Sequence, residues 1–236
     1  MKPGAKRQKA GSKFWNAEYA DGAHLALSDT PSEDLIKFLR WLTDEYKGNF
    51  LAHNSSVLDL GVGNGRNLIY LAKNFGVSGV GYDISEEAIA QAKQKSEGLN
   101  LSYEVRSVVG NLSVPESSQS LVLDMMTSHH LTKEARAHLR AEAARVLEPG
   151  GWLYLKTFFR DDDLHARRLL KESPAKEEGS YIHPDSGMAE HVFTQMELRA
   201  ELSPHFKIYK MNPSHRHFIN GRAGKRRSIS VYAQKI

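Results

Sequence analysis

The sequence contains no cysteine. This absence excludes disulfides, thiolate catalysis and zinc sites built from thiolates. The chain also lacks any apolar run close to the length of about 18 residues that indicates a transmembrane helix. Its basic N-terminus is not followed by the apolar segment of a secretory signal. We therefore expect a cytoplasmic protein that does not enter a membrane.

A regular set of metal ligands is also missing. Four histidines in the C-terminal third have irregular spacing and no carboxylate in register with them: His183, His191, His215 and His217. The last two would lie on one face of a strand, an arrangement that two metal ligands could use. Because no further ligand accompanies them, we expect no metal site.

Positive charge exceeds negative charge only slightly, with 32 Lys and Arg against 28 Asp and Glu. The excess lies at the two ends, in residues 1–13 and 222–227. These runs are either a solvated tail and a solvated hairpin, or a surface that binds RNA phosphates. Residues 1–13 are polar and nearly free of large apolar side chains, which predicts a disordered basic tail.

Helical and extended patterns alternate along most of the chain. Thr30-Pro31-Ser32-Glu33 is typical of a helix start, and the helix should continue to about Tyr46. Apolar runs between turn and helix signals predict five strands: Ser56–Leu60, Val77–Tyr82, Leu101–Val105, Leu121–Met126 and Trp152–Phe159. Strands that alternate with helices indicate an α/β fold with a parallel sheet and right-handed crossovers.

The remainder of the chain differs from this pattern. Residues 160–190 are polar and irregular, and a long connection of this kind is often functional. A short helix at Thr194–Leu202 and two strands, Phe206–Met211 and Ser228–Ala233, should follow. We predict a single domain over 14–236, made of a core, an insert on the acceptor side and a final strand pair: 50–160, 160–190 and 205–236.

Three glycines separate the first strand from the helix that follows it, in Gly61-Val62-Gly63-Asn64-Gly65. Glycines allow a sharp turn and let a ligand approach the main chain, and the helix behind offers free N–H groups. In parallel sheets of this class, ligands bind at the carboxyl ends of the strands.

The residues around this loop favour S-adenosylmethionine (SAM) over NAD. A dinucleotide site requires Gly-x-Gly-x-x-Gly, but Arg66 stands where the third glycine belongs. Asp59, two residues before the first glycine, would repel a pyrophosphate and attract a cationic amino-acid group. SAM carries an ammonium and a sulfonium but no phosphate. Asp83, at the end of the second strand, can accept hydrogen bonds from both ribose hydroxyls.

Four segments resemble the class I SAM-dependent methyltransferases, and the small enzymes often labelled type 11 above all. They are Val57–Gly65, Gly81–Ser85, Ser128–Leu131 and Arg145–Gly151, within residues 55–160. The resemblance implies a Rossmann-like sheet of seven strands, mostly parallel, with helices on both faces and an antiparallel last strand. It also implies SAM as the cofactor.

By this resemblance, Asp59 and Gly61 would lie near the methionine end of SAM, and Ile84 would pack on the adenine. The implied cofactor-binding residues are Asp59, Gly61, Gly63, Asn64, Gly65, Asp83, Ile84, Asn111 and Ser128. Ser128 would lie close to the sulfonium, and Asn111 would replace the acid that often receives the adenine amino group in this family.

Methyl transfer from a sulfonium is an in-line displacement, in which the protein supplies alignment and removal of water. A general base helps some acceptors by about 10²–10⁴-fold. The candidates are Asp124, His129 and His130. Alternatively, the histidines pack or orient their loop, and Asp124 hydrogen-bonds a backbone amide or the ligand.

We expect the acceptor to be a small molecule. The alternatives are RNA (tRNA or rRNA), reached through the basic ends, a ribosomal protein, or a protein that binds SAM without catalysis. The run Asp124-Met125-Met126-Thr127 is unlike the Asn-Pro-Pro-Tyr motif, which argues against adenine-N6 or glutamine methylation. The protein is expected to be a monomer or a homodimer.

Overall fold

The computed structural model describes residues 3–22, 27–46, 51–214, 218–219, 222–223 and 226–236, with side chains for 11–22, 27–45, 51–214 and 226–236. The chain divides into two compact units. The first unit comprises Met1–Val108 and Ser118–Leu123, and the second comprises Val109–Ser117 and Asp124–Ile236.

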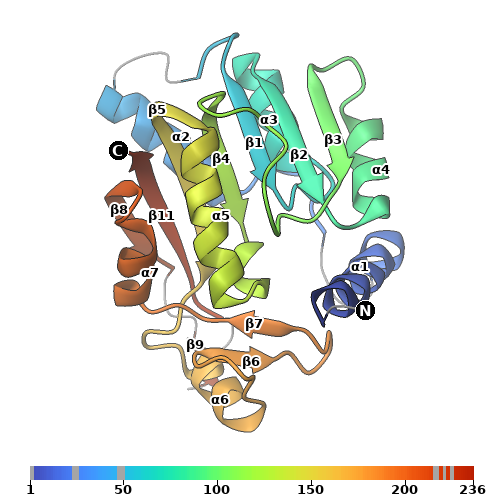
Figure 1. Ribbon diagram of the computed structural model, residues 1–236, viewed down its shortest axis with the longest axis vertical. Coiled ribbons are helices and arrows are strands. Elements are labelled where there is room, and N and C mark those ends of the chain that lie inside the picture. Colours follow the sequence, from blue (N-terminus) through green and yellow to red (C-terminus); the bar gives the residue numbers. More distant parts are fainter. Residues whose placement is uncertain (1–2, 23–26, 47–50, 215–217, 220–221, 224–225) are drawn as a thin grey trace. The chain divides into compact units, whose positions relative to one another are not determined.

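Parallel strands form the centre of the first unit: β1 (Ser56–Leu60), β2 (Ser78–Asp83) and β3 (Leu101–Val105), with most of β4 (Gln119–Met125). Strands β1, β2 and β3 lie side by side in the sheet (Figure 1). In register, Asp59 of β1 lies opposite Gly81 of β2, and Gly81 lies opposite Tyr103 of β3. All three strands therefore bring their carboxyl ends to one edge of the sheet.

Four helices complete the first unit: α1 (Pro3–Asp21), α2 (Glu33–Tyr46), α3 (Arg66–Phe75) and α4 (Glu86–Lys95). The start of α4 is fixed by Ser85, whose hydroxyl accepts the N–H of Ala88 at 3.1 Å. Helix α2 buries the apolar face predicted for it, which includes Phe38 and Leu42.

The second unit holds the remaining elements. They are η1 (Ser128–His130), α5 (Lys133–Val146), β5 (Leu147–Phe158), α6 (Leu164–Glu172), β6 (Ser180–Ile182), β7 (Ala189–His191), α7 (Gln195–Leu202), β8 (Phe206–Pro213), β9 (Phe218–Ile219), β10 (Arg222–Ala223) and β11 (Ser228–Lys235). Strand β11 is antiparallel to both β5 and β8, with Val231 opposite Leu155 and Met211.

The seven-stranded sheet has the order β3-β2-β1-β4-β5-β11-β8. Its last strand in the sequence runs antiparallel, so the predicted fold class is confirmed. Within the described part of the chain, no helix combines the length and the apolar composition that a membrane span needs.

The prediction of a disordered tail over residues 1–13 is wrong, because α1 covers Pro3–Asp21. The segment is rich in Ala, Lys, Arg and Gln, which favour helices, and α1 packs against α4. The Ser12 hydroxyl also donates to the carbonyl of Ile84 at 3.0 Å. Packing therefore supplies the stability that the local sequence does not reveal.

The segment 160–190 is more regular than predicted. It contains α6, which begins at the cap Asp163, and the antiparallel pair β6 and β7 (Figure 1). Strand β5 also starts five residues earlier than predicted, at Leu147. The expected single domain over 14–236 stays a prediction.

Candidate functional site

The glycine turn after β1 is fixed by backbone hydrogen bonds. The N–H groups of Gly61 and Val62 both donate to the carbonyl of Tyr82, at 2.8 and 2.9 Å. Gly63 has a φ of 58°, in the left-handed region that disfavours any residue with a Cβ. These hydrogen bonds join the turn directly to the end of β2, whose last residue is Asp83.

Asp83 connects the glycine turn to the start of α4. One carboxylate oxygen accepts the N–H of Gly63, and the other accepts the N–H of Ser85, both at 2.9 Å. Burial raises the pKa of the Asp83 carboxyl, although these backbone N–H groups act in the opposite direction. A carboxylate held in this way has a fixed orientation at the carboxyl edge of the sheet.

Helix α1 lies against this turn. A Cβ added to Gly63 would come within 2.3 Å of the Tyr19 hydroxyl. The hydroxyl of Ser85 and the amide oxygen of Asn16 are 2.8 Å apart, and the Tyr19 carbonyl accepts a hydrogen bond from Gln91 at 2.7 Å. Burial, and then the charge of Asp83, raise the pKa of the Tyr19 phenol, so the group stays neutral.

The structure brings six of the predicted cofactor residues together in the first unit: Asp59, Gly61, Gly63, Gly65, Asp83 and Ile84. Asn64 is directed elsewhere, because its amide donates to the carbonyl of Ser28 and to the carboxylate of Asp29. It therefore holds the segment before α2.

The chemistry of this group of residues fits SAM. Two acids, Asp59 and Asp83, lie at the glycine turn, and both act electrostatically on Tyr19. Such a field attracts an ammonium and a sulfonium and repels a pyrophosphate. The neutral phenol of Tyr19 and the two carboxylates supply polar groups of the kind that an amino acid or a ribose needs.

Asp124, in the second unit, is part of a buried ion pair. Arg140 donates to one carboxylate oxygen at 2.6 Å, and the N–H of Ser128 donates to the other at 3.1 Å. A second nitrogen of Arg140 donates to the Ser128 hydroxyl at 2.8 Å. All three residues are at most 1% exposed. Asp124 thus makes the backbone contact that one alternative expects, and its catalytic role stays a prediction.

His129 and His130 are neighbours after β4, with their rings tilted by 39° and their ring centroids 4.0 Å apart. The ring centroids of His129 and Phe158 are 4.9 Å apart in an edge-to-face arrangement. Burial, and then neighbouring charges, lower the pKa of His129 well below its ordinary value, and burial also lowers that of His130. Both imidazoles are therefore neutral at neutral pH.

These two histidines and Glu190 have ligand atoms within 4.8 Å of one another, close enough to hold a metal ion. However, Arg226 donates to the carboxylate of Glu190. A fixed guanidinium on the same carboxylate opposes a cation, so the arrangement does not favour a metal ion.

The histidines considered from the sequence have other partners. His191 lies between the Ser180 hydroxyl at 2.8 Å and the Glu197 carboxylate at 2.7 Å. His183 accepts backbone N–H groups through Nδ1. His215 and His217 lie outside the described residues.

Asn111 is exposed, and its side-chain oxygen lies 3.1 Å from Nε2 of His138 on α5. That contact occupies the oxygen expected to face the adenine. Its cofactor role, like that of Ser128, stays a prediction.

Residues 57–151 match the family model described as "Methyltransferase domain". Over this range the chain belongs to the class I SAM-dependent methyltransferases. The matched range runs from β1 to the start of β5 and includes the glycine turn and Asp83.

Two curated relatives of this chain have different acceptors in their names. The 27-O-demethylrifamycin SV methyltransferase of Amycolatopsis mediterranei (strain S699) is 30% identical over 66% of this chain and 55% of the relative. A tRNA (guanine-N(7)-)-methyltransferase of Helicobacter pylori is 32% identical over 52% of this chain and 33% of the relative. The chain thus spans about half or a third of the length of these relatives.

A solved SAM-dependent methyltransferase from Methanosarcina mazei is similar over nearly its whole length. It is 29% identical, with a TM-score of 0.66, over 81% of this chain and 97% of that one.

Sequence reasoning missed Arg140 and Arg226. A signal existed for the first, because Arg136 and Arg140 share the face of α5 that also buries Leu139. Two buried arginines on such a face indicate acidic partners, here the buried Asp124 and the partly buried Glu177 and Glu201. Arg226 lies in a basic run that gave no sign of its buried partner.

Proposed function

We propose that this protein transfers a methyl group from SAM to a small molecule. The observation that carries the proposal is the Asp83 carboxylate, held between the glycine turn and the start of α4 beneath Tyr19. Such a carboxylate suits the two hydroxyls of a ribose, and the acidic surroundings suit a sulfonium.

The residues have separate roles in this proposal. Asp83 binds the ribose, and the glycine turn with Asp59 receives the methionine end. Ile84 packs on the adenine. Bound SAM would supply an electrophilic methyl group, and the chain would supply orientation and removal of water.

His129 and His130 remain candidates for a general base. Their neutral state allows one of them to accept a proton from an acceptor hydroxyl or amine. Their lowered pKa values also make them weak bases, so most of the rate enhancement should come from alignment.

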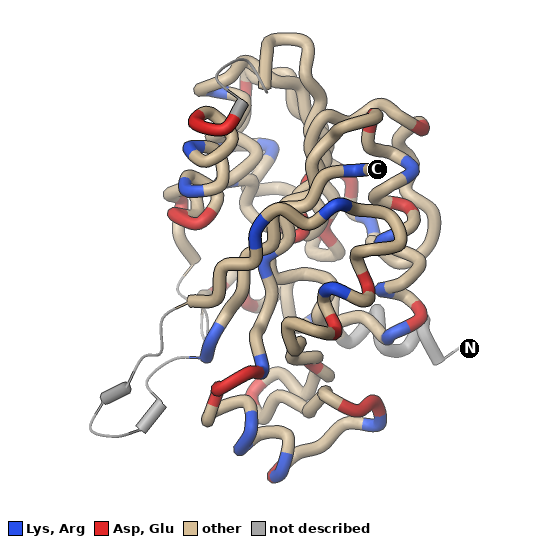
Figure 2. The backbone as a smooth tube through the Cα atoms, turned by 90° about the vertical axis from the view of Figure 1, so that its left-hand side faces the viewer, with Lys and Arg blue, Asp and Glu red and all other residues tan. Residues whose placement is uncertain are grey.

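A small-molecule acceptor is supported by the rifamycin relative, since that similarity covers more of both chains than the similarity to the tRNA enzymes. The tRNA enzymes and the basic ends favour RNA as the second candidate. Charges beyond those ends are of both signs along the described chain (Figure 2). Most of the end runs lies outside the described side chains.

Calorimetric titration with SAM, S-adenosylhomocysteine and NAD tests the cofactor. Micromolar binding of the first two and none of NAD is expected, and binding of NAD alone would reject the proposal. Transfer of a labelled methyl group to metabolite extracts and to bulk RNA then tests the acceptor. A product in the RNA fraction, with binding that weakens steeply as salt is raised, would replace the small molecule by RNA.

A further inference from the structure

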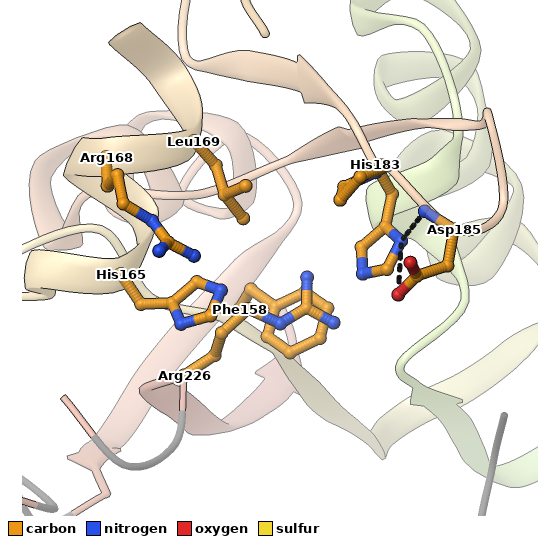
Figure 3. A pocket seen from close by; sticks show the side chains of 8 residues that line it. Phe158, His165, Arg168, Leu169, His183, Asp185 and Arg226 are labelled. Atoms are coloured by element: carbon orange, nitrogen blue, oxygen red, sulfur yellow. Dashed lines mark hydrogen bonds and ion pairs between the residues drawn. The ribbon is translucent and has the colours of Figure 1, made fainter. Parts of the chain in front are cut away.

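A cavity of about 480 Å³ lies wholly within the second unit, between α6, the end of β5 and the turn after β6. Its volume is typical of pockets for small organic ligands. Two arginines, two histidines and one acid line it: Arg168, Arg226, His165, His183 and Asp185 (Figure 3).

Arg226 is held in place before any ligand arrives. Its Nη1 donates to the hydroxyl of Tyr181 and to the carboxylate of Glu190. Its guanidinium carbon lies 3.5 Å from the centroid of the Phe158 ring. Because Glu190 and Tyr181 are buried, this guanidinium is anchored from behind and its orientation is fixed.

Arg168 stands across the cavity and has only a weak partner. Its contact with Glu172 measures 3.7 Å, and the side chains are 60% and 59% exposed. An exposed pair of this kind contributes little. Arg168 can therefore give its charge to a ligand at little cost.

Two histidines, His165 and His183, also line the cavity, and His183 can supply a hydrogen-bond donor. Nδ1 of His183 accepts the N–H groups of Asp185 and Ser186, which leaves Nε2 to carry the proton. Burial lowers the pKa of His165, and the charges of Arg168 and Arg226 lower it further. The charges of both arginines therefore act on the same imidazole at the cavity wall.

The acids limit how much negative charge a ligand can bring. Asp185 lines the cavity, and Glu190 lies behind Arg226. A dianion would add two negative charges beside these two carboxylates, whereas the single charge of a monoanion can pair with Arg168, whose contact with Glu172 is weak, and with Arg226. Leu169, Pro184 and Phe158 supply an apolar wall beside the charged groups.

We propose that this cavity binds the carboxylate of a small organic acid between Arg168 and Arg226, with the apolar part of the acid against Leu169, Pro184 and Phe158. Arginine forks match a planar carboxylate, and the cavity fits one aromatic or aliphatic acid of modest size. That this acid is also the methyl acceptor rests on the proposed function; its binding does not.

The test is a titration of the full chain with 4-fluorobenzoate, followed by fluorine NMR in the absence of SAM. Saturable binding is expected, and 4-fluorobenzamide, which lacks the charge, should not bind. Arg168→Gln should weaken binding by about 5–10-fold, since a hydrogen-bonded charge is lost at a partly exposed position. Arg167→Gln is the matched control, because Arg167 is the exposed neighbour on α6 and does not line the cavity.

Arg226 is tested in the double variant Arg226→Gln and Glu190→Gln, which avoids a buried carboxylate without its partner. This variant should fold and lose binding by at least the same factor. Equal affinity in the Arg167 and Arg168 variants, or equal binding of the benzamide, would overturn the proposal. Inorganic phosphate that bound more tightly than the acid would also overturn it.

Separate measurement of SAM affinity distinguishes this proposal from the proposed function. Normal SAM binding with no acid binding would reject the carboxylate pocket alone. Acid binding without SAM binding would reject the methyltransferase activity and leave the pocket in place.

Discussion

Single atoms decide the chemistry of the glycine turn. Each oxygen of Asp83 accepts one backbone N–H, from Gly63 and from Ser85, so the carboxylate cannot rotate without losing both contacts. The left-handed φ of Gly63 lets the turn approach Asp83 on one side and Tyr19 on the other. Two predictions follow from these contacts.

Replacement of Asp83 by alanine should weaken SAM binding by about 100-fold or more, the cost of two charge-assisted hydrogen bonds. Calorimetry measures the affinity, and thermal unfolding checks the fold. Asp44→Ala, at an exposed position of α2, is the matched control and should bind normally. Near-native affinity of the Asp83 variant would remove the ribose assignment.

Gly63→Ala should destabilise the protein by more than the roughly 1–2 kcal/mol that a left-handed alanine costs. The excess arises because the new Cβ would lie 2.3 Å from the Tyr19 hydroxyl. Gly98→Ala isolates the backbone term, since Gly98 has a φ of 79° and nothing within 4 Å of the added Cβ. Denaturant unfolding should show that Tyr19→Phe recovers part of the excess; equal costs at both glycines would contradict the contact.

At the scale of helices and strands, α5 and the turn after β4 are joined by one buried network. Arg140 binds Asp124 and Ser128, and Arg136 binds Glu177 and Glu201. The two arginines are one turn apart on α5 and are at most 1% exposed. Removal of Arg140 would leave the buried Asp124 without its guanidinium partner, and removal of Arg136 would do the same for the partly buried Glu177 and Glu201.

Arg140→Met should therefore cost about 3–5 kcal/mol of the free energy of unfolding, whereas Arg140→Met with Asp124→Leu should cost clearly less. Urea unfolding of both variants measures the difference. Turnover and stability measured for a third variant test the catalytic interpretation of Asp124. An Asp124→Asn variant of nearly normal stability that loses turnover would favour a direct role in catalysis.

Elements with strong local signals were predictable. Strands β1 and β3 have the predicted bounds, because each is a short run between turn or helix signals. The elements of the segment 160–190 were not predictable. Strands β6 and β7 have three residues each, too few to show the alternation of apolar and polar residues that is typical of a strand. Helix α1 depends on packing against α4, and packing of this kind leaves no mark in the local sequence.

The same limit applies to the candidate site. Asp59, the glycines and Asp83 belong to one contiguous turn and one neighbouring strand end, so spacing alone indicated that they meet. Arg226 and Glu190 are 36 residues apart and meet only through tertiary structure. Asn64 was predicted from its place in the motif. Its side-chain amide binds the segment before α2, and its cofactor role stays a prediction.

At the scale of the whole molecule, stability should depend on pH through the buried histidine pair. Burial lowers the pKa of both His129 and His130, so the folded protein leaves them neutral. The unfolded chain binds a proton at each below about pH 6.5. Because the unfolded state then holds more protons, the free energy of unfolding falls as the pH falls.

The expected slope below pH 6.5 is about 1.4 kcal/mol per pH unit for each histidine. Chemical denaturation between pH 7 and pH 5 measures it. His129→Gln should reduce the slope by about half, and His138→Gln, at an exposed site, serves as the control. A flat profile in the unmodified protein would show that the pair is protonated in the folded state.

The position of α1 also bears on how fast a ligand can come and go. Ser12, Asn16 and Tyr19 tie this helix to Ile84, Ser85 and Gln91, over the residues assigned to the nucleoside. A ligand that uses those residues must wait for the helix to loosen. Its observed association rate should then reach a plateau at high concentration, set by the opening rate of α1. The residence time of the ligand, more than its affinity, would then depend on α1.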